Sequence, residues 1–248
     1  MQVNKKPQDQ GYMNQRKQIL SKNSHFDVRE AYKTLRANIR FSLPGKDGGK
    51  FCITSSISGE GKSITIVNLA ISFAQAGKKV LLIDGDMRRP ALARLMIEKA
   101  SPGLSNVLAG LNTAEESIRR EVYPNLDILF SGDVPPNPSE LLDSKEMEKL
   151  IEKLSHAYDY ILMDTPPVTI VSDACIIGNM LDGVLYLVRQ NRAEKKMVAD
   201  GINQLQLSGT KLLGFIFNGV ETKKRRYNAY ATEYYKRSET APLDPKED

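Results

Sequence analysis

The chain has 248 residues, which is enough for one large α/β domain or two small ones. Of these residues, 41% are hydrophobic and 26% are charged, and the formal net charge is +5 at pH 7. No apolar run approaches the roughly 20 residues of a membrane-spanning helix, and the polar, basic N-terminus predicts no signal peptide. Cys52 and Cys175 lie far apart in apolar contexts, which argues against a disulfide or metal framework and favours a reducing cytoplasm.

Basic ends flank a slightly acidic middle. Residues 1–50 carry 11 Lys and Arg against 4 Asp and Glu, residues 51–220 carry 17 against 20, and residues 221–237 carry 6 against 2. Basic arms of this kind can bind nucleic acid or an anionic membrane surface, or they can be solvated and partly disordered. For residues 1–26 we expect the second, a basic flexible arm.

A glycine-rich loop connects the apolar run at residues 51–55 with a helical pattern at residues 62–76. In such a strand, loop and helix, backbone N–H groups and the positive end of the helix dipole face bound phosphates. Lys62 is expected to reach the β- and γ-phosphates, and the Ser63 hydroxyl to ligate Mg²⁺. The expected ATP-binding residues of this P-loop are Ser58, Gly59, Glu60, Gly61, Lys62 and Ser63.

The loop departs from the consensus at Ser56, where a glycine is usual. A glycine-x-glycine-lysine-serine string also occurs by chance in ordinary turns. The strand before it and the helix after it favour nucleotide binding over a chance turn.

Strand-like and helical patterns alternate through the rest of the middle region. The runs are mostly continuous and apolar, as in parallel strands that are buried on both faces. This alternation predicts an α/β domain over residues 27–220: a three-layer P-loop NTPase fold with a mainly parallel sheet flanked by helices. The expected strands are residues 79–84, 126–130, 160–164, 183–189 and 211–218, and the expected helices are residues 143–156, 173–181 and 193–206.

Three aspartates stand at the ends of predicted strands. Asp84 and Asp86 end or follow the run at residues 79–84, and Asp164 ends the run at residues 160–164. A turn or helix cap explains one Asp comfortably but the pair less well. Ligands of parallel sheets bind beyond these strand ends, and a carboxylate after an apolar run is typical of a Walker B motif. The expected catalytic residues are Lys62, Asp84 and Asp86, and the expected Mg²⁺ ligands are Ser63, Asp84, Asp86 and Asp164.

A P-loop followed by an apolar Asp84-x-Asp86-x-Arg88 and an apolar Asp164-Thr-Pro-Pro resembles the bacterial tyrosine kinases, which are relatives of the MinD/ParA-type ATPases. The similarity covers nearly the whole chain and includes the string at residues 135–142, PPNPSELL. It is strongest to the cytoplasmic kinase subunits that regulate capsule or exopolysaccharide synthesis. MinD/ParA-type proteins carry a signature lysine where this chain has Ile57, which favours the kinase branch.

The resemblance implies an ATP- and Mg²⁺-dependent protein-tyrosine autokinase. One of the two aspartates of the Asp-x-Asp motif, with Asp84 preferred, would accept the tyrosine hydroxyl proton or orient the metal. Asp164 would hold Mg²⁺ through water. Asn218 matches a position that reads adenine, although a strand-end turn residue is an equal interpretation.

The tail at residues 221–248 is the expected acceptor of the phosphate. Its autophosphorylation candidates are Tyr227, Tyr230, Tyr234 and Tyr235. Three of them also fit one face of an amphipathic helix, but few aliphatic residues accompany them. A basic, aromatic segment can also stack on single-stranded nucleic acid, which ranks below autophosphorylation here, so no nucleic-acid partner is expected.

Glu30, Lys33 and Arg36 recur every three residues, which places them on one side of a helix within about 120°. An i,i+3 surface ion pair is one interpretation. The resemblance implies another, in which this face contacts the neighbouring subunit of a ring and phosphorylation occurs in trans. Lys33 stands where the family has Arg and lacks the bidentate fork of the guanidinium group.

The family's split arrangement also implies partners. A separate transmembrane chain-length regulator would present its cytoplasmic tail and bring this cytoplasmic chain to the inner face of the membrane, and a phosphotyrosine phosphatase would act on the product. Two other functions remain open. One is a MinD/ParA-like positioning ATPase, and the other is a non-catalytic, nucleotide-dependent scaffold of the polysaccharide machinery.

Overall fold

The computed structural model describes residues 16–43 and 48–220. Its contacts separate the chain into two units, Met1–Asn218 and Gly219–Asp248. The four candidate tyrosines of the tail, at positions 227, 230, 234 and 235, lie outside the described residues. In the described ranges, no helix is long and apolar enough to cross a membrane.

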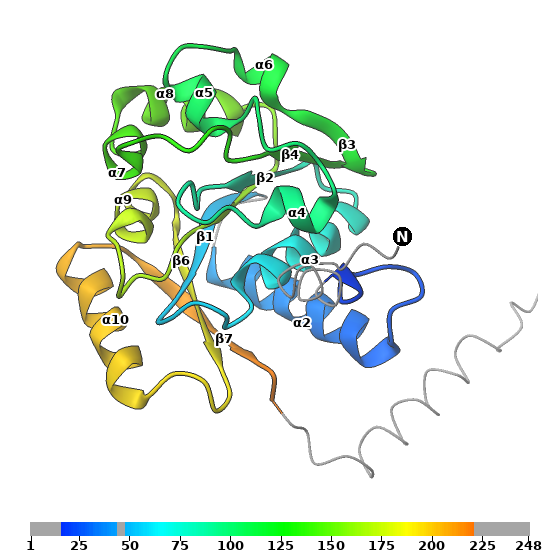
Figure 1. Ribbon diagram of the computed structural model, residues 1–248. Helices are drawn as coiled ribbons and strands as arrows, with labels where there is room; N and C mark the ends of the chain where they lie inside the picture. Colours follow the sequence, from blue (N-terminus) through cyan, green and yellow to red (C-terminus); the bar gives the residue numbers. More distant parts are fainter. Residues whose placement is uncertain (1–15, 44–47, 221–248) are drawn as a thin grey trace, which may run out of the picture. The chain divides into compact units, whose positions relative to one another are not determined.

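Within the described part of the chain, seven strands form one sheet in the order β3-β4-β2-β5-β1-β6-β7 (Figure 1). All neighbouring strands pair in parallel except β3, which is antiparallel to β4. The predicted mainly parallel sheet is confirmed. The strands are β1 Gly49–Ser55, β2 Val80–Asp84, β3 Arg119–Tyr123, β4 Leu126–Leu129, β5 Tyr160–Asp164, β6 Gly183–Arg189 and β7 Leu212–Asn218.

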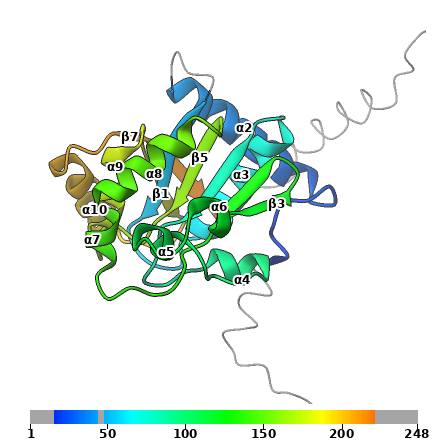
Figure 2. The same cartoon turned by 90° about the horizontal axis from the view of Figure 1, so that it is seen from above.

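Helices cover both faces of the sheet. Figure 1 shows α2 and α3 on one side and α9 and α10 on the other, and Figure 2 shows the same separation from above. The longer helices are α2 Phe26–Ser42, α3 Lys62–Gln75, α8 Lys145–Ser155, α9 Asp173–Met180 and α10 Lys195–Leu207. Short helices connect the strands at α4 Leu92–Met96, α5 Leu104–Leu108, α6 Ala114–Ser117 and α7 Pro138–Leu142.

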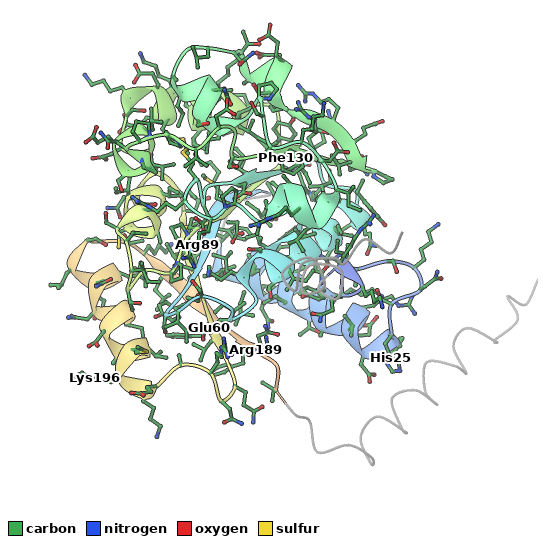
Figure 3. The ribbon with its side chains drawn as sticks, viewed as in Figure 1. His25, Glu60, Arg89, Phe130, Arg189 and Lys196 are labelled. Carbon is green, nitrogen blue, oxygen red and sulfur yellow. The ribbon has the colours of Figure 1, made fainter. Side chains whose placement is uncertain are left out.

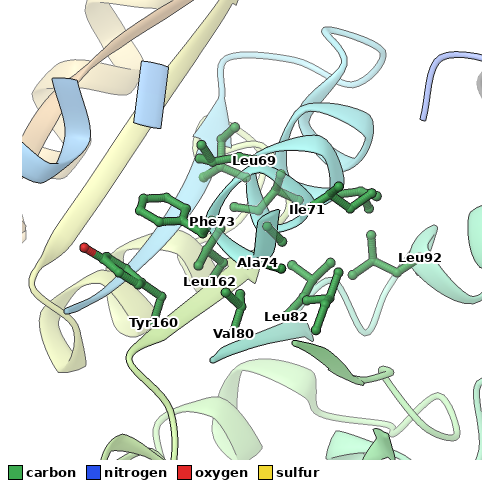
Figure 4. Close-up of a cluster of buried hydrophobic side chains, with 14 of the residues drawn as sticks. Leu69, Ile71, Phe73, Ala74, Val80, Leu82, Leu92, Tyr160 and Leu162 are labelled. Carbon is green, nitrogen blue, oxygen red and sulfur yellow. The ribbon is translucent and has the colours of Figure 1, made fainter. Parts of the chain in front are cut away.

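The side chains of the central strands alternate between two hydrophobic clusters because successive residues of a strand point to opposite faces. On β2, Val80 and Leu82 join the cluster beneath α3, whereas Leu81 and Ile83 join the cluster beneath α8 and α9. Figure 4 shows the first cluster. In it, the ring centroids of Phe73 in α3 and Tyr160 in β5 lie 4.1 Å apart. Burial on both faces accounts for the continuous apolar runs.

Helix α3 is also covered on its outer side, by α2 and by the residues that precede it. Asn68 accepts a hydrogen bond from the backbone N–H of Leu20 (2.7 Å) and donates to the carbonyl of Gln18 (2.9 Å) and to Tyr32 (3.1 Å). Leu20 is only 3% exposed. The structure therefore differs from the expected flexible arm at residues 18–20, which pack on α3 because Asn68 binds their backbone.

Candidate active site

The P-loop runs from the end of β1 to the first turn of α3. Gly59 and Gly61 have φ angles of +84° and +101°, a left-handed conformation that favours glycine. A Cβ on Gly61 would lie 2.4 Å from Nδ2 of Asn218. Both the backbone conformation and the close approach of Asn218 therefore require a glycine at position 61.

Ser56 occupies the position of the missing consensus glycine. Its side chain is buried, with its Oγ 2.9 Å from the hydroxyl of Tyr186, and its carbonyl accepts a hydrogen bond from the hydroxyl of Thr169. The serine is thus packed against β6 and the loop after β5, so the deviation leaves the strand-loop-helix arrangement intact.

Glu60 and Asn218 brace the P-loop from inside. The Glu60 carboxylate is fully buried and accepts hydrogen bonds from the backbone N–H of Ile57 (3.0 Å) and of Arg189 (3.1 Å). Figure 3 shows Glu60 and Arg189 close together. Asn218 donates from Nδ2 to the carbonyl of Glu60 at 2.7 Å. The side chains of both residues, which the sequence assigns to ATP binding, have partners within the protein that fix the shape of the loop.

Lys62 is only 8% exposed, and its ammonium donates to Oγ of Ser55 at 3.1 Å. Burial lowers the pKa of Lys62 below its usual value, and the nearby carboxylates, Asp164 first among them, oppose this shift. A desolvated ammonium at a helix N-terminus is well placed to bind a phosphate.

Asp84 and Asp164 are register partners at the carboxyl ends of β2 and β5. They are 0% and 1% exposed. Asp84 accepts a hydrogen bond from the backbone N–H of Leu92 at 3.2 Å through Oδ2. The Oδ1 atoms of both aspartates are buried and have no hydrogen-bond partner among the described residues. Unpaired buried oxygens are rare and mark a place for a ligand.

The electrostatics of this pair are unfavourable without a cation. Burial raises the pKa of the Asp84 carboxyl well above its usual value, and the charge of Asp164 adds to the rise. Burial likewise raises the pKa of Asp164 to about 6, while the Lys62 ammonium opposes the rise. A divalent cation between the carboxylates and a bound phosphate would offset this repulsion.

The residues present fit Mg²⁺. This ion prefers oxygen ligands and is usually bound by one or two carboxylates together with substrate phosphates and water. No group of three His, Cys, Asp or Glu that could hold a metal occurs in residues 16–43 and 48–220. Asp84, Asp164 and the neighbouring Ser63 hydroxyl would supply protein ligands of a site that the nucleotide completes, and the predicted ligand Asp86 lies at the same edge of the sheet.

Asp86 lies beyond the end of β2 and is only partly buried. Its Oδ1 accepts a hydrogen bond from the backbone N–H of Arg89 at 2.9 Å. Its charge raises the pKa of both Asp84 and Asp164, so the three predicted aspartates lie at one edge of the sheet. Asp86 is the most accessible of the three.

Sequence reasoning missed several polar residues around this edge. Ser55 binds Lys62, and Arg88 binds both Ser139 and Asp173. Arg88 and Ser139 do belong to the two motifs noted above, but neither motif indicates that they meet in space.

The predicted oligomerisation face on α2 makes contacts within its own chain. Lys33 and Glu30 form an i,i+3 ion pair at 2.7 Å. Arg36 donates to the carbonyl of Ser72 and, at 3.2 Å, to its Oγ. Glu30 and Lys33 remain partly exposed and can meet another chain.

Known proteins resemble this chain over most of its length. Residues 50–205 match the family model described as "AAA domain". "Tyrosine-protein kinase YwqD" of Bacillus subtilis is 41% identical over 205 residues, which cover 82% of this chain and 86% of that protein. The solved kinase domain of Escherichia coli tyrosine kinase ETK has a TM-score of 0.75 and 33% identity, covering 81% of this chain and 79% of that one.

A more distant likeness supports the fold alone. The septum site-determining protein MinD of Pyrococcus horikoshii, solved with Mg-ADP, has a TM-score of 0.59 and 24% identity over 74% of this chain and 76% of that one. The P-loop ATPase fold is thus common to both groups, whereas the higher identities and coverage lie with the kinases. The chain belongs to the bacterial tyrosine-protein kinases.

Proposed function

We propose that this chain is an Mg²⁺- and ATP-dependent autokinase that phosphorylates the tail tyrosines of a neighbouring copy. The observation that carries the proposal is the pair of buried Oδ1 atoms of Asp84 and Asp164 beside the desolvated Lys62. Neither oxygen has a hydrogen-bond partner in the part of the chain that the structure describes. Family membership supports the reaction type. The candidate acceptors are Tyr227, Tyr230, Tyr234 and Tyr235.

Each part of the site has a task in phosphoryl transfer. Backbone N–H groups of the P-loop and the start of α3 bind the phosphates, and Lys62 stabilises the charge on the transferred group. Ser63, Asp84, Asp86 and Asp164 would hold Mg²⁺, which would neutralise charge on the phosphates when it is bound. Such positioning and charge neutralisation account for most catalysis of this kind.

The reaction itself is a displacement at phosphorus. The tyrosine oxygen forms a bond to the γ-phosphorus, the bond from this phosphorus to the bridging oxygen breaks, and ADP leaves with the electron pair. The hydroxyl proton passes to an aspartate of the Asp-x-Asp motif. The resemblance favours Asp84 as the proton acceptor or as the residue that orients the metal, and Asp86 is the more accessible of the two.

Regulation and partners follow from the resemblance. We infer that the chain works at the inner face of the membrane in the synthesis and export of capsular or extracellular polysaccharide. A transmembrane chain-length regulator would bind it through a cytoplasmic tail, and a phosphotyrosine phosphatase would reverse the modification.

Phosphotyrosine mass spectrometry on the purified protein tests the proposal. With Mg-ATP, with or without the cytoplasmic tail of a membrane partner, we expect phosphate on the tail tyrosines. Lys62→Met and Asp84→Asn should abolish it. Measurable ATP binding without phosphotyrosine under every condition would contradict the kinase and leave the nucleotide-dependent scaffold.

A further inference from the structure

Three side chains from separate segments form a closed hydrogen-bonded triangle next to the site. Arg88 follows β2, Ser139 lies in α7 and Asp173 is the first residue of α9. Arg88 donates from Nε to Oδ2 of Asp173 at 3.0 Å and from Nη2 to Oγ of Ser139 at 2.7 Å. Ser139 donates to Oδ1 of Asp173 at 2.7 Å. We call these three residues the Arg88 clamp.

The clamp is built around a carboxylate that has no access to water. The Asp173 side chain is 0% exposed, whereas that of Arg88 is 37% exposed. A buried carboxylate is strongly unfavourable unless both oxygens are paired. Oδ2 binds Arg88, and Oδ1 binds Ser139 together with a longer contact of 3.4 Å to Nη2 of Arg88. These requirements fix the guanidinium in one orientation.

Arg88 in turn anchors the loop that carries Asp86. The two residues are separated only by Met87, whose side chain is buried. Asp86 closes the turn by accepting the N–H of Arg89. The turn is therefore held at one end by Asp86 and at the other by the clamp, which ties it to α7 and α9.

The other two aspartates do not need such an anchor. Asp84 and Asp164 end neighbouring strands and face each other in the parallel register, so the sheet sets their positions. Asp86 stands beyond the last hydrogen-bonded residue of β2. Its place relative to Lys62 depends on the loop, and a metal or phosphate ligand must be held within fractions of an ångström.

We propose that Arg88, Ser139 and Asp173 are positioning residues that set the Asp86 carboxylate in the metal–nucleotide site. This inference rests on the proposed function. It also gives a role to the proline-rich string at residues 135–142. Pro138 lies in the first turn of α7, where its fixed φ favours the helix, and the following residue, Ser139, reaches the clamp.

Hydrogen–deuterium exchange in the nucleotide-free protein tests the clamp without activity. In the Arg88→Gln and Ser139→Ala variants, the amides of residues 85–92 should exchange faster than in the wild type. The increase should be at least roughly fivefold, the effect of one lost hydrogen bond, because each variant removes two or more. Arg120→Gln is a matched control because it breaks an exposed Arg–Asp pair of 2.9 Å between β3 and β4. The control should leave exchange in residues 85–92 unchanged.

The Mg²⁺ dependence of nucleotide binding is the second readout. In Arg88→Gln, the Mg²⁺ concentration that half-saturates ATP binding should rise roughly tenfold, as for residues that orient metal ligands. The affinity for ADP without Mg²⁺ should stay the same. Arg88→Lys keeps the positive charge but loses the bidentate guanidinium group. Its half-saturating Mg²⁺ concentration should therefore lie between those of the wild type and Arg88→Gln.

The two proposals fail in different ways. A folded Arg88→Gln variant with wild-type exchange in residues 85–92 and a wild-type Mg²⁺ requirement would overturn the clamp. A wild-type protein that binds ATP without any Mg²⁺ dependence would instead contradict the proposed metal site, and the exchange experiment would still decide for or against the clamp.

Discussion

At the scale of single residues, the site holds two buried carboxylates whose negative charges repel each other. Asp84 and Asp164 are buried side by side, and each has one oxygen that accepts no hydrogen bond within residues 16–43 and 48–220. The sheet cannot relieve this repulsion because both carboxylates end hydrogen-bonded strands. Electrostatics therefore favour the binding of a cation at this site. Without a cation, the free energy of unfolding should depend on the ionisation of Asp84 and Asp164.

This dependence has a definite sign. The folded-state pKa of Asp164 is about 6, above its ordinary value of 3.8. Between these two values the folded protein keeps a proton that the unfolded chain has lost, so the free energy of unfolding decreases as the pH rises through the window. From pH 5 to pH 7, Asp164 should cost the wild type about 1 kcal/mol of stability.

Urea unfolding without metal or nucleotide measures the effect. The Asp164→Asn variant should show a flatter change in stability from pH 5 to pH 7 than the wild type. Exposed Asp143 offers a matched control, since Asp143→Asn should keep the wild-type pH dependence. Identical pH profiles for the wild type and Asp164→Asn would contradict a raised pKa of Asp164 in the folded protein.

At the scale of secondary-structure elements, the P-loop is held in shape by contacts with the ends of β6 and β7. Asn218 at the end of β7 reaches the Glu60 carbonyl 158 residues away along the sequence. Its amide nitrogen also lies only 2.4 Å from where a Cβ of residue 61 would stand. This geometry favours bracing of the loop over selection of the base.

Nucleotide selectivity distinguishes these roles. If Asn218 braces the loop, Asn218→Ala should weaken ATP and GTP equally, by roughly fivefold for one lost hydrogen bond. Calorimetric titration with both nucleotides checks this. Asn179→Ala, which removes an amide that binds the Ser208 carbonyl at 3.0 Å, is the control. A loss confined to ATP would instead assign Asn218 to adenine.

The elements of this fold that can be predicted are those whose sequence of apolar and polar residues corresponds to their burial in the structure. The central strands β1, β2 and β5 are continuous apolar runs because they are buried on both faces, whereas β7 at the sheet edge is apolar in sequence but only partly buried. Strand β3 escapes prediction because Arg119–Tyr123 is polar and half-exposed at the sheet edge. Helices α4 to α7 have only four or five residues, too few to show a helical period.

The candidate site divides in the same way. Asp84 and Asp164 are predictable because each ends a buried strand, and Lys62 because it ends a recognisable loop. The hydrogen bonds of Glu60 and the Arg88 clamp cannot be predicted in this way, because hydrogen bonds between distant segments produce no local sequence pattern. The packing of Leu20 on α3 is missed for the same reason, because its partner Asn68 is 48 residues away.

At the scale of the whole molecule, phosphorylation in trans requires one copy of the chain to contact another. Glu30 and Lys33 are the part of the α2 face that is free to do so, whereas Arg36 binds Ser72 in its own chain. We therefore expect the double variant Glu30→Ala, Lys33→Ala to shift the mass measured by light scattering towards the monomer.

A second ion pair provides the control for this variant. Lys153 and Glu115 also lie 2.7 Å apart at an exposed position, away from α2. Their replacement by Ala should leave the mass of the protein unchanged, because exposed pairs contribute little to stability. Equal masses for the α2 variant and the wild type would exclude this face from the oligomer.

Mixing two inactive variants of this chain tests phosphorylation of the tail in trans. One chain carries Lys62→Met and has no catalysis; the other has Phe at positions 227, 230, 234 and 235 and has no acceptors in its tail. With Mg-ATP, phosphotyrosine should appear on the Lys62→Met tail only in the mixture. A mixture without phosphotyrosine, despite ATP binding by the second chain, would contradict phosphorylation of the tail in trans.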